Sequence, residues 1–358
     1  MFIHQRFEQV FQREPLVLVD VGARGGLRPN WRAAQPHLKI VGFEPEADEF
    51  ERLNRQAGAD GMTVFFHAAL HKRAESLVLH IARDRGLTSI FEPNRAFLDS
   101  FPEAERFDTV ATAEMTTDTM DHVLHTGGIG DVDFVKVDTQ GSELFILQGG
   151  EQTLRRSVVG VEVEVEFAPV YRNQPLFADV DAYLRSLGFS LFDLRPCYWK
   201  RADGRTVGGP QGQLIWADAL YLREVTALPE LLSELEPARR AAKLLKSLSV
   251  SILYGYFDYA LALLTASGSV LSAEDQRVAR ATWVRPGNVG IGSRSFPADN
   301  TAGRSATRSW GILADGRLRR RRHQFSSHFD LHRLRLGPLR SAARANTQPR
   351  ALQHPQLA

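Results

Sequence analysis

The amino-acid sequence predicts an α/β protein with a seven-stranded, mostly parallel sheet whose last strand is antiparallel, followed by a small C-terminal helical extension. Three observations predict this fold. Apolar, β-branched runs alternate with helical patterns through the first two thirds of the 358 residues, as in successive βαβ units. The last two strand-like runs are joined by a Gly- and Pro-containing link without helical period, which favours a hairpin. Beyond Leu228, apolar residues recur at i, i+3 and i+4, as in packed helices.

The expected elements follow the chain from one apolar run to the next. The seven strands are predicted at residues 16–22, 39–45, 62–70, 133–139, 158–167, 189–195 and 217–224. Helices are predicted around residues 46–57, 142–156 and 177–187. An additional strand is predicted at residues 76–83, and residues 86–115 are predicted to be irregular.

The charge distribution divides the chain. Residues 284–358 hold 14 Arg, no Lys and 3 Asp, a net charge of +11, which leaves 30 basic and 39 acidic residues, or −9, in residues 1–283. We therefore predict a domain over residues 1–225, a helical extension over residues 226–283 and an Arg-rich, disordered tail over residues 284–358. The tail is expected to be solvated, with at most weak contact to an anionic surface such as nucleic acid.

The composition favours a globular protein of a reducing compartment. The hydrophobic content of 43% is ample for a core. Cys197 is the single cysteine, so no internal disulfide is expected, and the first residues lack the pattern of an export signal. We therefore expect a cytoplasmic protein. The longest apolar run, residues 248–266, has Asp258 at its centre, which favours a packed helical segment over a membrane span.

The first two predicted strands end in residues that suit a nucleotide-like ligand. In "VDVGARGG", glycines such as Gly22 let the backbone approach a ligand, although a tight strand-to-helix turn would need them too. Glu44 ends the second strand, 24 residues after Asp20, where a carboxylate usually accepts hydrogen bonds from ribose hydroxyls. A dinucleotide and an S-adenosyl compound fit these features equally.

Asp20 favours the S-adenosyl compound. Its carboxylate, two residues before the first glycine, would repel a pyrophosphate but attract an ammonium or sulfonium group. The small Ala68 and Ala69 could leave a flat slot for an adenine ring. The neighbouring His67 and His71 are interpreted as polar residues of a strand end rather than as general bases, and no Cys/His cluster has zinc spacing.

The fourth predicted strand, in "DFVKVDTQGSELFILQGG", carries charge where a buried parallel strand is normally apolar. Asp138 arrives at its carboxyl end, next to the end of the first strand, and we expect it to face the same crevice as Asp20. Ser142 is a suitable N-cap for the following helix. Glu143 suits the first turn of that helix, and this structural role and a catalytic role for Glu143 are equally compatible with the sequence.

The fifth predicted strand, "VEVEVEF", is more unusual. Its Glu162, Glu164 and Glu166 alternate with valines and point to one face, where carboxylates need hydrogen bonds, cations or a metal. One hypothesis is structural: Lys136 and nearby arginines neutralise this strand. The other is functional: Glu164 or Glu166, nearest the carboxyl end, binds or deprotonates a hydroxyl substrate.

Several motifs together resemble the FkbM family of S-adenosylmethionine-dependent methyltransferases. In order, they are "VDVGARGG", "VGFEPEAD", "LTSIFEPN", "TTDTMDHVL", "DFVKVDTQGSELFILQGG" and "VEVEVEFAPVYRNQPLFADVDAYLRSLGF", within residues 16 to about 224. The resemblance implies a Rossmann-like methyltransferase sheet and O-methylation of sugars, glycans or other secondary metabolites. By position, it implies that Asp20, Gly22 and Ala23 hold the methionine part of the cofactor, that Glu44 holds the ribose, and that Asp138 lines the junction of cofactor and substrate.

One departure from the family concerns the residues after "DVGA". Members usually have a small residue or Asn there, whereas this chain has Arg24 followed by Gly25 and Gly26. The Arg24 guanidinium could crowd the cofactor or pair with its carboxylate. We include Arg24, Gly25 and Ala69 among the expected cofactor-binding residues.

The sequence therefore predicts an O-methyltransferase that uses S-adenosyl-L-methionine and acts on a small-molecule or carbohydrate acceptor. Asp138 is the first choice for polarising or deprotonating the acceptor hydroxyl, followed by Glu164 and Glu166. A divalent metal held by Asp138 and the glutamates is a variant that the residues leave open. The alternatives are an NAD-dependent oxidoreductase and a catalytically inactive cofactor-binding or interaction module. The acceptor and the oligomeric state do not follow from the sequence.

Overall fold

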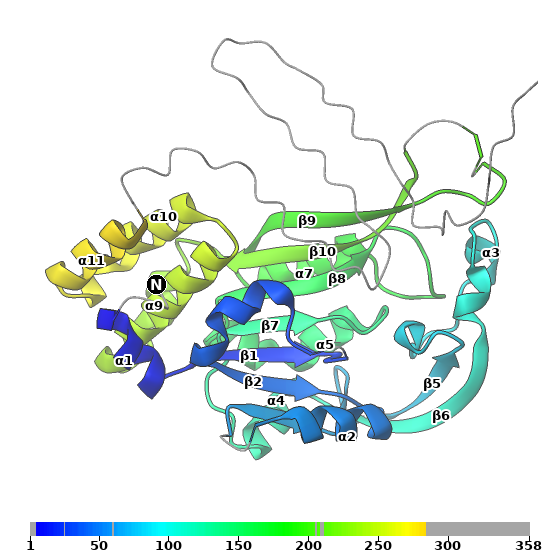
Figure 1. The fold of residues 1–358 in the computed structure, drawn as a ribbon, viewed down its shortest axis with the longest axis horizontal. Helices are drawn as coiled ribbons and strands as arrows, with labels where there is room; N and C mark the ends of the chain where they lie inside the picture. The colour runs from blue at the N-terminus through cyan, green and yellow to red at the C-terminus, as the bar shows by residue number, and fades with distance from the viewer. Residues whose placement is uncertain (1–4, 25, 59–60, 205, 208–210, 284–358) are drawn as a thin grey trace, which may run out of the picture. The chain divides into compact units, whose positions relative to one another are not determined.

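The computed structural model describes residues 5–24, 26–58, 61–204, 206–207 and 211–283. Within them, seven strands form one sheet in the order β3–β2–β1–β7–β8–β10–β9 (Figure 1). These strands are β1 (Leu16–Val21), β2 (Leu38–Phe43), β3 (Thr63–Phe66), β7 (Phe134–Val137), β8 (Gly160–Glu166), β9 (Phe189–Trp199) and β10 (Gln213–Arg223). The first five run parallel, and β10 pairs antiparallel with both β8 and β9. The predicted mostly parallel sheet with an antiparallel last strand is therefore confirmed.

A second, three-stranded sheet has the order β4–β6–β5. Its strands are β4 (Ala69–Leu70), β5 (Ser76–Ala82) and β6 (Thr109–Asp118). Two predictions are wrong here. The strand predicted over residues 62–70 is interrupted, because the chain leaves the large sheet after Phe66 and joins the small one at Ala69. Residues 109–115, predicted to be irregular, belong to β6, which is largely exposed and therefore lacks the apolar alternation that identifies a strand.

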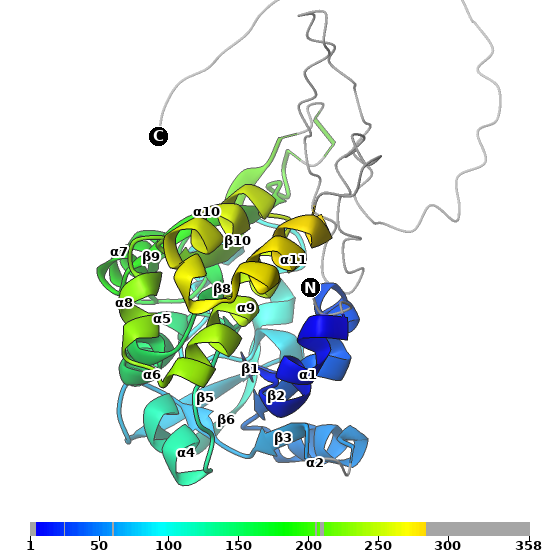
Figure 2. The ribbon, with the colours of Figure 1, turned by 90° about the vertical axis from the view of Figure 1, so that its left-hand side faces the viewer.

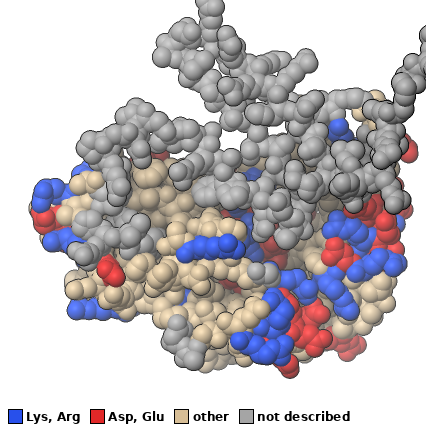
Figure 3. All heavy atoms as spheres, in the orientation of Figure 1, with Lys and Arg blue, Asp and Glu red and all other residues tan. Residues whose placement is uncertain are grey.

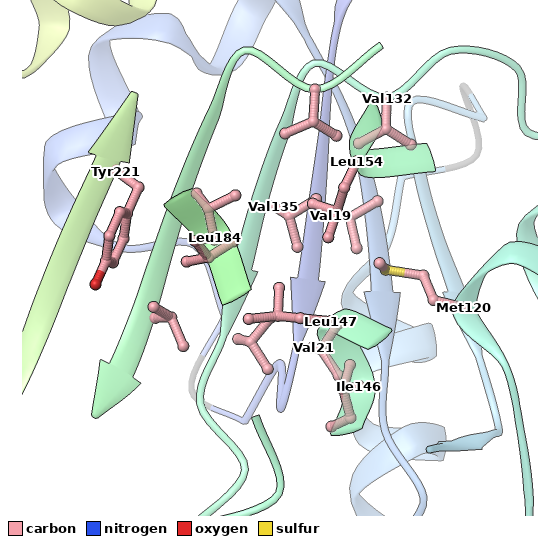
Figure 4. Packing of buried hydrophobic residues seen from close by; sticks show 14 of the residues in the cluster. Val19, Val21, Met120, Val132, Val135, Ile146, Leu147, Leu154, Leu184 and Tyr221 are labelled. Carbon is pink, nitrogen blue, oxygen red and sulfur yellow. The ribbon is translucent and has the colours of Figure 1, made fainter. Parts of the chain in front are cut away.

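One face of the large sheet packs against α4 (Met120–Thr126), α5 (Glu143–Gly149), α6 (Glu151–Arg156) and α7 (Phe177–Ser186). The strands contribute alternate valines, and Figure 4 shows Val19, Val21 and Val135 beside Leu147 and Leu184. This alternation is what the period of two in a strand provides. The helix predicted over residues 142–156 is divided into α5 and α6 at Gly150.

The other face packs against the N-terminal α1 (Gln5–Arg13), the 3-10 helix η1 (Pro29–His37) and the helical extension. The extension comprises α8 (Leu228–Ser233), α9 (Pro237–Leu253), α10 (Phe257–Ser267), η4 (Gly268–Val270) and α11 (Ala273–Trp283). Figures 1 and 2 both show α9 beside α1, at the end where β1 and β2 begin. Leucines of α8–α10 join Leu16, Leu18 and Phe134 in one core, which crosses the predicted boundary after residue 225.

The remaining described elements lie between the strands: α2 (Ala47–Gln56), η2 (Arg85–Leu87), α3 (Arg95–Leu98) and η3 (Ala104–Phe107). At the lower edge of the face shown in Figure 3, where α2 lies, basic and acidic side chains are intermixed, as in the pairs Arg52–Glu49 and Arg55–Glu51. The apolar run 248–266 is shared by α9 and α10, and among the described helices none has the length and hydropathy of a membrane span.

The charged strand residues share the face of the sheet opposite the valine core. Strand register places Asp20 beside Lys136 and Lys136 beside Glu162. Asp138 and Glu164 follow two residues later on the same face, because side chains alternate along a strand. This face is thus apolar toward the amino ends of the parallel strands and charged toward their carboxyl ends, where the candidate site lies.

Candidate active site

The predicted site residues converge on the carboxyl edge of β1, β2, β7 and β8. Asp20 is near the end of β1, Glu44 follows β2 directly, Asp138 follows β7, and Glu164 and Glu166 end β8. Because these four strands are parallel and adjacent, one edge of the sheet presents all five carboxylates. Ala69 instead lies in β4 of the small sheet, and Gly25 is outside the described residues.

The loop after β1 passes against the end of β7. Gly22 has φ +77°, and a Cβ at this position would stand 2.0 Å from the carbonyl oxygen of Asp138. The Gly22 and Ala23 amides donate to the Phe43 carbonyl at 3.3 and 3.4 Å, which ties the loop to the end of β2 as well. Gly22 therefore brings the ends of three strands together in a way that no residue with a side chain could.

Lys136 lies within ion-pair distance of two of the carboxylates. Its Nζ donates to Asp20 Oδ1 at 3.0 Å and stands 3.8 Å from Asp138 Oδ2. Burial disfavours the ammonium, but the two aspartates outweigh it and hold the pKa of Lys136 above its ordinary value. The hypothesis that Lys136 neutralises the glutamates of β8 is therefore wrong: its partners are Asp20 and Asp138, and Asp20 is already paired with a cation.

The second strand end is also buried. Glu44 is 5% exposed, and its Oε1 accepts a hydrogen bond from the Glu46 amide at 2.9 Å. Burial raises the pKa of the Glu44 carboxyl, although the amide and Arg24 act in the opposite direction. The Arg24 guanidinium itself pairs with the Glu46 carboxylate beside this site.

An arginine that no sequence motif indicates connects β7, β8 and β10. Arg28, just before η1, contacts Asp218 through two hydrogen bonds of 3.0 and 3.1 Å, Glu162 at 3.0 Å and Asp138 at 3.5 Å. Burial disfavours the charge on Arg28, but Asp218 and Glu162 more than compensate and raise the pKa of the guanidinium. Arg28 thus links the acidic strand ends to one another.

Glu162 is neutralised from a second side. It is 2% exposed, and its Oε2 receives Arg195 at 2.7 Å and the Tyr254 hydroxyl at 2.9 Å. The signal that could have identified Arg195 and Asp218 was present, since both are charged residues inside predicted strands. Tyr254 and Arg28 carried no comparable signal, because they come from helical or irregular segments far away in the sequence.

Gln140 holds two of the candidate catalytic carboxylates. In a left-handed conformation of φ 61°, it directs its Nε2 to Glu164 Oε1 at 2.8 Å and to Asp138 Oδ1 at 3.4 Å. The Tyr171 hydroxyl donates to Gln140 Oε1 at 3.1 Å, which fixes the orientation of the amide. Asp138 and Glu164 are therefore neighbours with a shared hydrogen-bond donor.

The acidic groups around Gln140 have raised pKa values. Burial, followed by the neighbouring carboxylates, raises the pKa of Glu164 and of Glu166 well above the ordinary value. Glu143, whose carboxylate accepts from the Thr139 and Gly141 amides at 2.7 and 2.9 Å, has a pKa raised by burial to about 7. Ser142 is the N-cap residue of α5 and Glu143 lies in its first turn, as predicted, but Ser142 forms no side-chain cap hydrogen bond. The Glu143 carboxylate accepts the turn amides instead.

The metal variant depends on how closely the carboxylates are grouped. Among the residues that the structure describes, no three His, Cys, Asp or Glu side chains are placed to hold a metal ion together. The arrangement can instead bind hydroxyl groups through carboxylate oxygens and accept a proton near neutral pH.

Comparison with known proteins gives one family. The family model described as the methyltransferase FkbM domain matches residues 20–191. No curated protein matches the chain.

Among solved structures, methyltransferase FkbM from Methylobacillus flagellatus KT is similar with a TM-score of 0.31 and 13% identity. The alignment covers 58% of this chain and 43% of that chain, so this chain spans less than half of the Methylobacillus protein. Magnesium protoporphyrin IX methyltransferase from Synechocystis PCC 6803 has a TM-score of 0.29 and 10% identity, with 62% and 79% covered. A 16S rRNA (adenine(1408)-N(1))-methyltransferase from Catenulisporales acidiphilia has a TM-score of 0.30 and 16% identity, with 61% and 90% covered.

Proposed function

The chain belongs to the FkbM family of S-adenosylmethionine-dependent methyltransferases, and from this premise we propose that it methylates a hydroxyl oxygen of a sugar, glycan or other small metabolite. The observation that carries the acceptor class is the carboxylate pair Asp138 and Glu164, joined by Gln140 at the carboxyl edge, with Asp138 next to the Gly22 loop. The family decides against the NAD-dependent alternative.

The residues at the ends of β1 and β2 fit the cofactor by their chemistry. Glu44 is a buried carboxylate with a raised pKa, and ribose hydroxyls would supply it with hydrogen-bond donors that solvent does not. The backbone of Gly22 and Ala23 would hold the methionine part, and Asp138 would border the transferred group. When bound, S-adenosylmethionine supplies a methyl group activated by a positively charged sulfur.

We assign Glu164 as the residue that accepts the hydroxyl proton. Its Oε1 is held by Gln140, which leaves Oε2 for the acceptor. A carboxyl with a raised pKa is a stronger base than an ordinary one, so it is better matched to a hydroxyl group near neutral pH. Asp138, 28% exposed in its side chain and held by Arg28 and Lys136, would orient the acceptor hydroxyl.

The surroundings of Glu164 suit a polyhydroxylated acceptor. Asp138, Glu164 and Glu166 offer several carboxylate oxygens along one edge, and each can accept a hydrogen bond from a separate hydroxyl. Trp216 is the partner of Glu166 in the β8–β10 ladder and is half-buried, so an aromatic residue borders this edge on the same face of the sheet. A sugar presents both hydroxyl edges and an apolar ring face, and such a surface would complement both.

The test combines labelled S-adenosylmethionine, fractionated extract from the source organism and two matched variants. Glu164→Gln should lower turnover by about 10²- to 10⁴-fold, the usual contribution of a general base, while the affinity for S-adenosylhomocysteine remains unchanged. Glu114→Gln, the same change at an exposed position on β6, should leave turnover unchanged. Transfer should continue in EDTA.

The labelled product should be a small molecule or glycan that carries a methyl ether, identified by mass spectrometry. Label in nucleic acid or protein would refute the acceptor class. Full turnover by Glu164→Gln would remove Glu164 as the base, and an absence of transfer to every fraction would favour the inactive-module alternative.

A further inference from the structure

A basic cavity lies at the edge of the sheet opposite the candidate active site. Its volume is ≈ 390 Å³, and its cations are Lys39 from the start of β2 and Arg239, Lys243 and Lys246 from α9. Figure 1 shows α9 beside the end where β1 begins, whereas the candidate site is at the end where β1 finishes. The cavity is therefore separate from the residues assigned to methyl transfer.

Two of these lysines are almost completely buried around one aspartate. Lys243 and Lys246 have side chains 4% and 7% exposed, and both ammonium groups contact the fully buried Asp133. Lys246 Nζ stands 3.1 Å from Asp133 Oδ2, and the same oxygen accepts the Val17 amide at 2.8 Å. Two buried cations thus share one fully buried carboxylate, and the nearest further carboxylate, Asp131, is already paired with Arg239 and Arg156.

The mouth of the cavity adds further positive charge. Arg239, about half exposed, pairs with Asp131 at 2.7 Å, while Lys39 is partly exposed and forms no ion pair with any described residue. Glu14 and Asp131 are the acidic lining residues, against four cations. The lining is therefore net positive, even when the buried Asp133 is included.

This arrangement is unfavourable without an anion. Burying an uncompensated charge costs several kcal/mol in real proteins, and the burial of Lys243 accordingly lowers the pKa of its ammonium in spite of Asp133. Lysine ammonium groups bind phosphate as point charges, so clustered lysines favour a phosphate over a neutral ligand. A volume of ≈ 390 Å³ lies within the range of small-molecule sites and exceeds what one inorganic ion fills.

We propose that the amino-edge cavity, lined by Lys39, Arg239, Lys243 and Lys246, is a binding site for a small phosphorylated molecule. The phosphate would lie between Lys39 and the buried lysine pair, with Arg239 at the mouth. If the lysines only fastened α9 to the sheet through Asp133, neither Lys39 nor Arg239 would be needed, since neither contacts Asp133. Substitutions of Lys39 and Arg239 at the mouth can therefore distinguish phosphate binding from attachment of α9 to the sheet.

The experiment is calorimetry on the full-length chain with inorganic phosphate, pyrophosphate and citrate at constant ionic strength. We expect saturable binding of pyrophosphate at one site per chain, tighter than binding of citrate. Lys39→Gln/Arg239→Gln should weaken this binding about tenfold or more, because two charge-assisted contacts to the anion are lost. Thermal unfolding without ligand checks that each variant is folded, and Lys39→Gln alone serves if the double variant is not.

The matched control is Arg277→Gln. Arg277 is an exposed arginine of α11 whose ion pair with Glu274 at 2.7 Å resembles the pair of Arg239 with Asp131. All variants keep the basic residues 284–358, so a loss confined to the mouth variants reports the cavity and not the rest of the chain. Equal pyrophosphate affinity in the wild type and in the mouth variants would overturn the proposal, as would absent saturation or tighter binding of citrate.

Discussion

Arg28 offers the sharpest test of the charge network, through the substitution Arg28→Met. The guanidinium contacts Asp218, Glu162 and Asp138, and among the described residues Arg195 is the other arginine paired with Asp218 and Glu162. Methionine keeps most of the apolar stem of the side chain but removes the charge. Two largely buried carboxylates, 2% and 15% exposed, would then share a single arginine.

The expected cost follows from this loss of one cation. Removing one partner of a buried ion pair typically costs about 3–5 kcal/mol, because a charge is left unpaired. Arg28 is 25% exposed and Arg195 remains, so we expect a loss of about 3 kcal/mol in the free energy of unfolding at pH 7. The measurement is urea unfolding followed by far-UV circular dichroism.

Two further variants isolate the contact. Arg28→Met/Asp218→Asn removes the unpaired carboxylate together with the arginine, so the double variant should be less destabilised than the sum of the single changes by about 1–3 kcal/mol. Arg32→Met, at an exposed position of η1, should change stability by less than about 0.5 kcal/mol. A loss below about 1 kcal/mol for Arg28→Met, or strict additivity in the double variant, would refute this explanation of the network.

The pH dependence provides an independent check of the same contact. Burial acts to raise the pKa of Asp218, but Arg28 and then Arg195 outweigh it and lower that pKa below the ordinary value. A carboxyl with a lowered pKa stabilises the fold above its unfolded pKa and loses this contribution as the pH falls through its folded pKa. The stability difference between wild type and Arg28→Met should therefore narrow below about pH 4.

Two other predictions concern the turn residues. Gly22→Ala should weaken binding of S-adenosylhomocysteine about tenfold or more in calorimetry. Gly26 has a similar φ of +75° but nothing near the position of a Cβ, so Gly26→Ala should only lower stability by about 1–2 kcal/mol. Similar cofactor affinities in the two variants would show that the Gly22 loop does not bind the cofactor. Because burial raises the pKa of Glu143 to about 7, the contribution of this carboxyl to stability is complete at acid pH and is lost as the pH rises through 7. In urea unfolding, the free energy of unfolding of the wild type should therefore fall by about 1–3 kcal/mol relative to Glu143→Gln between about pH 5 and 8. A stability difference that stays constant with pH would contradict this pKa.

The order of the strands and helices along the chain was predictable because most strands can be recognised from their own residues. The buried strands β1, β7 and β8 are short runs rich in valine that also carry charged residues, and the link between β9 and β10 has no helical period. By contrast, β6 is exposed over most of its length, so its sequence has no periodic pattern of apolar residues. Its extended conformation depends on its pairing with β5. The predicted domain boundaries stay predictions.

The candidate site was predictable as a set of strand ends but not as a network. Asp20, Asp138 and Glu164 could be placed at one edge because parallel strands end together. The partner of each charge depended on distant segments: Arg28 precedes a 3-10 helix, Tyr254 directly follows α9, and Gln140 occupies a left-handed turn. For the same reason, Lys136 was assigned to the strand on its wrong side, since it could pair with either neighbour.

The position of β10 determines the order in which the sheet can be completed during synthesis. The strand is the last of the seven in sequence, yet it lies between β8 and β9. Strand β8 therefore has an unpaired edge until β10, which ends at Arg223, has been synthesised, and β9 has no neighbour in the sheet before then. We expect the two final strands to pair first as a hairpin and to dock as a unit, after which α8 and α9 cover the new surface. A chain that stops at residue 191, the end of the family match, would leave the sheet unfinished at β8.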